Sequence, residues 1–114
     1  GVMWWLEHLY LGESVRDKEK EIKRKLRTNA GITGVHILAL SLQPEEQIDI
    51  FPAQLLKQRA FPKDELYIFG FAGGKAEALA MVTGICQETL DATGDADMRS
   101  FLGAMSYRRS RGIT

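Results

Sequence analysis

The segment Leu66–Gly94 constrains the fold of this chain more than any other stretch. Seven apolar and aromatic residues lead into the double glycine Gly73-Gly74, and a long amphipathic run follows directly. The first part alternates in the manner of a strand, whereas the run Lys75–Ala92 has helical spacing. Gly94 then provides a common stop signal for a helix. The segment therefore predicts a strand, a tight turn and a long helix, against which the rest of the chain packs.

The predicted helix has a buried side and a solvent-facing side. Helical spacing of the apolar residues assigns seven side chains to the core. They are Ala78, Leu79, Val82, Ile85, Cys86, Thr89 and Leu90. The opposite side carries Glu77, Gly84, Glu88 and Asp91 and is expected to face water.

Two elements are predicted at the N-terminal end of the chain. Aromatic and apolar residues indicate a strand at Trp5–Leu11. Serine is a favoured helix cap, so Ser14 marks the start of a helix that we expect over Ser14–Asn29. Within it, Glu19–Lys23 and Glu21–Lys25 have the i,i+4 spacing at which opposite charges attract on a helix surface.

The middle of the chain predicts a hairpin. Gly34–Leu42 is almost continuously apolar, which is typical of a central strand covered on both faces. Gln47–Phe51 alternates polar and apolar residues, and Pro44 between the two runs favours a turn. Ala53–Arg59 is expected to form one or two helical turns, and Ala96–Met105 a short helix.

The order strand, helix, hairpin, strand, helix, helix indicates an α+β domain built as a two-layer sandwich. Its mixed sheet is expected to have about four strands, with the first and second strands parallel if they are neighbours. We expect residues 2–105 to form the single domain. Residues 106–114 are expected to be a flexible basic tail, because they contain Arg108, Arg109 and Arg111 and little that can be buried.

Charge and cysteine content exclude several classes of protein. Among 114 residues, 15 basic and 15 acidic side chains cancel, so no overall field recruits nucleic acid or a membrane. No apolar run reaches the roughly 18 residues of a membrane span. The single cysteine, Cys86, cannot form an internal disulfide and fits a cytoplasmic location. No motif indicates a cofactor or a metal.

The double glycine is the first candidate site. Backbone amides of Gly73, Gly74 and Lys75 at a helix N-terminus are suited to hold a small anion such as phosphate. The chain has only A-G-G-K-A here, however, and lacks the full G-x-x-x-x-G-K-[S/T] phosphate loop. A tight structural turn between strand and helix is the simpler interpretation.

The second candidate is a basic surface on the first predicted helix. Five cations fall on one side of the helical wheel, as polyanion binding requires. They are Arg16, Lys20, Lys23, Arg24 and Arg27. No aromatic residue alternates with them, and acidic residues share the segment, so an ordinary solvated helix face is the favoured interpretation.

His8 and His36 form a weaker third candidate, because they lie on different predicted strands and would meet only if those strands pair. A metal or acid–base site would need that proximity and a carboxylate. A histidine that is hydrogen-bonded within the core is the alternative. Cys86 is expected to be inert on the apolar side of its helix.

Four short motifs give the chain a resemblance to a group of small bacterial proteins of unknown function. The motifs are L-x-L-G-E-S-V at Leu9–Val15, Q-I-D-I-F at Gln47–Phe51, G-F-A-G-G-K-A-E-A at Gly70–Ala78 and D-A-T-G-D-A-D at Asp91–Asp97. None is a catalytic signature. The resemblance implies no activity and supports only a self-standing domain.

The sequence therefore favours a non-enzymatic interaction protein that self-associates as a homodimer or other homo-oligomer. An aromatic patch or a free sheet edge would provide the contact. Polyanion binding by the Arg16–Arg27 face is one alternative, and a small-anion site or enzyme at Gly73–Lys75 is the other.

Overall fold

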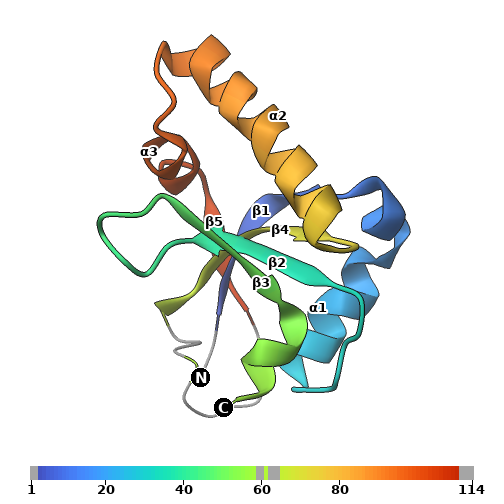
Figure 1. Ribbon diagram of the computed structural model, residues 1–114. Helices are drawn as coiled ribbons and strands as arrows, with labels where there is room; N and C mark the ends of the chain where they lie inside the picture. The colour runs from blue at the N-terminus through green and yellow to red at the C-terminus, as the bar shows by residue number, and fades with distance from the viewer. Residues whose placement is uncertain (1–2, 59–60, 62–64, 111–114) are drawn as a thin grey trace.

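The computed structural model describes residues 3–58, 61 and 65–110, which form an α+β fold around one mixed sheet (Figure 1). Within these residues the sheet has five strands in the order β3-β2-β4-β1-β5. The strands are β1 (Trp4–Leu11), β2 (His36–Leu40), β3 (Ile48–Pro52), β4 (Tyr67–Ala72) and β5 (Tyr107–Arg109). The predicted α+β class and mixed sheet are confirmed, and the sheet has one strand more than expected.

Strand pairing follows the apolar character of β4, which lies at the centre of the sheet. β4 pairs with β1 in parallel and with β2 in antiparallel orientation, and β2 and β3 form the predicted antiparallel hairpin. β1 and β2 are therefore separated by β4 and do not pair with each other, so the parallel pair involves β1 and β4. The most continuously buried strand takes the middle position of the five described strands.

Gly70 in β4 allows β1 to come close. A Cβ at this position would lie 2.8 Å from the backbone oxygen of Tyr10, which cannot move away as a side chain could. The β1–β4 register also shifts between the Trp5 and Tyr10 pairs. Gly70 thus permits a close approach of two strands at an irregular point of the sheet.

The tail prediction is wrong for residues 107–110. Tyr107–Arg109 forms β5, which pairs antiparallel with β1 at the sheet edge. Ser110 is buried, and its hydroxyl accepts a hydrogen bond of 2.7 Å from the backbone N–H of Met3. Main-chain hydrogen bonds to β1 order this segment, so its small number of apolar side chains did not make it a flexible tail. Residues 111–114, including Arg111, lie outside the described residues.

Helices cover both faces of the sheet, which adds a second helical layer to the two-layer arrangement expected (Figure 1). The 3₁₀ helix η1 (Glu13–Lys18), α1 (Glu19–Arg27) and the 3₁₀ helix η2 (Ala53–Lys57) lie on one face. α2 (Lys75–Thr93) and α3 (Met98–Gly103) lie on the other. Alternation along β2 sends Ile37 and Ala39 to the first core and Leu38 to the second.

The predicted helix Ser14–Asn29 is divided into η1 and α1, and Ser14 does not cap it. The Ser14 hydroxyl donates a hydrogen bond to Glu77 on α2, and it does not bond to a backbone N–H of its own helix. α2 ends as predicted. Gly94 has φ +85°, a left-handed conformation that glycine adopts without steric cost, and its N–H donates to the carbonyl of Leu90.

Candidate functional site

The Gly73–Lys75 turn lies between β4 and α2, where the sequence places a small-anion site. The carboxylate of Glu77, in the first turn of α2, folds back onto this turn. Its Oε1 accepts hydrogen bonds from the backbone N–H of Gly73 at 2.6 Å and from the Ser14 hydroxyl at 2.7 Å. Its Oε2 accepts from the backbone N–H of Ser14 at 3.2 Å. These bonds hold the pKa of Glu77 below the usual 4.5.

An anion of the chain itself therefore occupies part of the predicted anion site. Side chains at Gly12 or Gly73 would clash with Glu77 or Ser14, so both glycines make room for this contact. Glu77 uses the Gly73 amide that an external phosphate would need. The turn consequently links η1 to α2. This is a structural role, as the interpretation of Gly73-Gly74 as a tight turn between strand and helix expects.

A cleft of about 310 Å³ opens beside the same turn. η1, α1 and the segment before β2 form its walls, and Ser14 and Gly73 lie at one end. Lys18, Glu21 and Lys25 also line it, and Lys25 pairs with Glu21 at 3.1 Å. Among described residues Lys18 is the lining cation without an ion pair, so the cleft has one free positive charge for a small anion.

The five cations of the predicted polyanion surface are not equivalent. Lys23 pairs with Glu19 at 2.8 Å, as the i,i+4 spacing predicts. Lys23 and Arg27 also lie over the ring of buried Trp5, at 5.5 and 5.7 Å from its centroid. These two cations cover the core in cation–π contacts. Three cations remain exposed without an ion pair in the described part of the chain; they are Arg16, Lys20 and Arg24.

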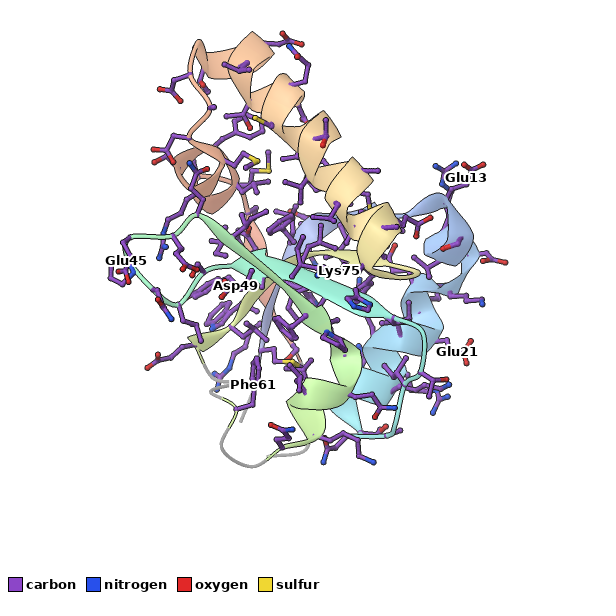
Figure 2. All side chains as sticks on the ribbon, viewed as in Figure 1. Glu13, Glu21, Glu45, Asp49, Phe61 and Lys75 are labelled. Carbon is purple, nitrogen blue, oxygen red and sulfur yellow. The ribbon has the colours of Figure 1, made fainter. Side chains whose placement is uncertain are left out.

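Acidic residues lie beside these three cations. Figure 2 shows Glu13 and Glu21 pointing away from the body of the protein on the same side as η1 and α1. Lys25 and Glu21 form a second i,i+4 pair, also as predicted. The outward surface of η1 and α1 is therefore a mixture of both signs of charge, and this supports a solvated helix face more than a polyanion site.

The two histidines do not come together. His8 is exposed on β1 and His36 half-buried on β2, and β4 lies between these strands. Over residues 3–58, 61 and 65–110, no cluster of three or more histidine, cysteine, aspartate or glutamate side chains is arranged to hold a metal ion. Nor does any helix in this part of the chain combine the length and apolarity needed to cross a bilayer.

The outward face of α2 is a surface that sequence reasoning missed. Leu79 and Leu90, both expected in the core, are 51% and 40% exposed. Ala78, Ile85 and Thr89 are buried against the sheet as expected, so the buried side of the helix is narrower than predicted. Leu79 and Leu90 belong to an exposed face that recurs with helical spacing and consists mostly of small and apolar residues, with the exposed charges of Glu88 at its edge and Asp91 just beyond Leu90. Its members are Ala76, Leu79, Ala80, Thr83, Gly84, Gln87 and Leu90.

A signal for this face exists in the sequence. Ala76, Ala80 and Gly84 follow one another at four-residue spacing, opposite the buried line of α2. A solvated helix normally carries charged residues at such positions. Small residues there leave the helix backbone open to close approach, and a Cβ at Gly84 would meet nothing within 4 Å.

Comparisons of the chain with family models, with curated proteins and with solved structures give no match. The resemblance based on short motifs stays a prediction. Function is therefore argued from the surfaces described above.

Proposed function

We propose that this protein is a non-enzymatic interaction module that self-associates, and that the outward face of α2 is the contact surface. The observation that carries the proposal is the exposed face of small and apolar residues from Ala76 to Leu90 on a 19-residue helix, bordered by the charges of Glu88 and Asp91. Figure 1 shows that α2 lies on the outside of the molecule, over the sheet.

A second copy of the chain suits this face for two reasons. Small residues at four-residue spacing let two helices approach closely, and the leucines beside them gain by leaving water. The chain also has no net charge, so two copies do not repel one another as strongly charged proteins do.

The energetics indicate a reversible dimer. Each half-exposed leucine that becomes buried contributes about 1 kcal/mol, and a symmetric pair of α2 helices buries four of them. Association costs several kcal/mol in lost freedom of motion, so about 4 kcal/mol from the leucines must be supplemented by close backbone packing. We expect a dissociation constant in the micromolar range, roughly 1–100 µM.

The test is sedimentation velocity over a concentration series spanning that range. Ala80 lies in the middle of the face, so A80E places two like charges in the contact while keeping a residue that favours helix. We expect A80E to weaken association at least about tenfold, which corresponds to about 1.4 kcal/mol.

K20E is the matched control, because it places the same side chain on an exposed position of α1. It should associate as the wild type does. A wild-type protein that stays monomeric at every concentration, or an A80E variant that associates normally, contradicts the proposal.

Both alternatives from the sequence stay predictions. The small-anion site is supported by the cleft beside Gly73 and by Lys18, but the Gly73 amide already binds Glu77. The polyanion surface retains Arg16, Lys20 and Arg24. A cytoplasmic location, predicted from the single cysteine, is part of the proposal for an interaction module.

A further inference from the structure

β1 is longer than the strand that pairs with its outer edge. It spans the eight residues Trp4–Leu11, whereas β5 pairs with only the first three of them. The Glu7 N–H still donates to the Ser106 carbonyl at 2.9 Å, but the segment before Ser106 connects to α3 and is not a strand. In the described part of the chain, therefore, no strand pairs with His8–Leu11 on the β5 side.

Main-chain groups of this open stretch point to the side that lacks a strand. Successive residues of a strand direct their N–H and C=O groups to opposite sides. The Glu7 N–H points toward β5, whereas the Gly12 N–H points toward β4 and donates to a carbonyl of that strand at 2.9 Å. Counting from either end places the N–H and C=O of Leu9 and Leu11 on the β5 side.

The open stretch also lacks the residues that usually protect a strand edge. Natural edge strands are commonly protected by charged side chains, especially lysine, by proline or by being very short. His8–Leu11 reads H-L-Y-L, and each of its residues is half-buried or exposed. The short strand β5 carries Arg108 and Arg109, so its own edge is protected in the usual way. The second half of β1 is thus the more open place for a further strand.

An almost entirely apolar pocket of about 370 Å³ lies beside this stretch. It is lined by Leu6, Glu7, His8, Tyr10, Met105 and Ser106. Leu6, His8 and Tyr10 are alternate residues of β1, so their side chains share one face of the strand. A strand added beside β1 places every second side chain on this face, and one of them therefore lies over the pocket.

A carboxylate lies at the Tyr10 end of the pocket. Glu88 of α2 is exposed and accepts a hydrogen bond of 2.8 Å from the Tyr10 hydroxyl. No cation in the described part of the chain forms an ion pair with Glu88. On an added strand, the side chain level with Tyr10 is two residues from the side chain level with His8. A lysine or arginine at that position would complement the charge of Glu88.

We propose that the open stretch of β1 binds an extended segment of a partner protein, which adds to the sheet as a strand in line with β5. The segment has an apolar side chain in the pocket and a basic side chain two residues away, beside Glu88. A small apolar molecule would fill the pocket but give no partner to the main-chain groups of Leu9 and Leu11, whereas an extended segment does both. The site does not depend on self-association through α2.

The probe is the peptide acetyl-T-K-T-L-T-K-T-amide, whose sequence reads the same in both directions and suits either strand orientation. Titrated into the full chain, it should shift the NMR amide signals of Leu9, Leu11 and Met105. We expect a dissociation constant on the order of 1 mM, because one apolar anchor and a few main-chain bonds must offset the ordering of the peptide.

Amide hydrogen exchange tests whether a strand forms. Exchange at Leu9 and Leu11 should slow in the complex, since the peptide carbonyls accept hydrogen bonds from these N–H groups. Shifts without slower exchange would mean that the pocket holds only a side chain, and this contradicts the proposal. Signals of Leu9 and Leu11 that shift with protein concentration before peptide is added would identify a second copy of the chain as the occupant, which also contradicts it.

Two changes in the peptide separate its anchor from its main chain. Alanine in place of the leucine should weaken binding about tenfold, because most of the apolar burial is lost. N-methylation of the leucine and its two neighbours removes main-chain donors and should abolish binding. Unchanged affinity after either change overturns the corresponding contact and the proposal with it.

A charge exchange tests Glu88. E88K should weaken the lysine peptide about three- to tenfold and strengthen the peptide that has glutamates in place of the lysines. E45K is the matched control, because Glu45 is exposed between β2 and β3 at the other edge of the described sheet. A80E should bind the peptide as the wild type does, so this result and that for self-association are independent. Equal effects of E88K and E45K contradict the assignment.

Discussion

α1 and α2 are both surface helices, but their outward faces differ in kind. α1 presents charged side chains that pair with one another, and among its residues only Ile22 is fully buried. α2 buries Ala78, Ile85 and Thr89 and presents mostly small and apolar residues on its outward face, with Glu88 and Asp91 at the border. Water solvates the first face well and the second poorly.

The difference teaches which helix is available for a partner. Three of the five cations of α1 already have contacts within the chain, since Lys23 and Arg27 lie over Trp5 and Lys25 pairs with Glu21. The leucines of α2 remain half-exposed. A partner that covers α2 gains apolar burial, whereas one that covers α1 must displace existing ion pairs and hydration.

The largest expected effect concerns the anchoring of α1. I22A should lower the free energy of unfolding by about 2–4 kcal/mol, because it leaves a cavity at the single buried position of this helix. L79A on α2 should change it by less than about 0.5 kcal/mol in the monomer. Urea unfolding at low protein concentration measures both.

Hydrogen exchange would sharpen this result, since I22A should speed exchange in α1 before it affects α2. Similar losses of stability in I22A and L79A would show that the leucine is part of the core. The contrast between the two helices would then be wrong.

The second effect concerns Glu77, which joins the two regions through Ser14. Its pKa is lowered in the folded protein by the hydrogen bonds to Gly73 and Ser14. The stability that the carboxylate contributes is therefore fully present above pH 4.5, its usual pKa, and is lost as the pH falls through the lower folded value. E77Q should remove about 1 kcal/mol at pH 7, because a neutral acceptor replaces a charged one at a partly exposed site.

Thermal or urea unfolding between pH 7 and pH 3 measures this contribution. Glu7, Glu21 and Asp97 also have lowered pKa values, so both proteins lose stability in acid and only their difference reports on Glu77. The gap between wild type and E77Q should close as the pH falls below 4.5. A gap that is independent of pH would assign the effect to packing.

The smallest effect is expected at the charged face of α1. With Arg16, Lys20 and Arg24 as its free cations, single-stranded nucleic acid should bind only at low salt, with a slope of log affinity against log salt near −2. The double variant K20E/R24E should abolish that binding, as measured by fluorescence anisotropy. R109E, on strand β5, is the control; binding that survives in K20E/R24E would move the polyanion site elsewhere.

Local patterns predicted most individual elements. Alternation and apolar runs placed β1, the β2–β3 hairpin and β4, and spacing together with Gly94 placed α2 within a residue or two. These features depend on residues close together in the sequence, so strand propensity, helix propensity and turn signals can be read locally. The candidate site was predicted less well. The Gly73 amide donates to Glu77, and Glu77 is held in turn by Ser14, which lies 63 residues away in the chain.

The sequence by itself determined the α+β class, the strand–turn–helix at Leu66–Gly94 and the mixed charge of α1. The tertiary structure decided the pairing of β1 with β4, the ordering of β5 and the narrow buried side of α2 that leaves Leu79 and Leu90 exposed. Each of these depends on contacts between distant segments, where backbone pairing and close packing outweigh local preference. The surface proposed for self-association therefore follows from how α2 packs on the sheet, since its apolar pattern alone places Leu79 and Leu90 in the core.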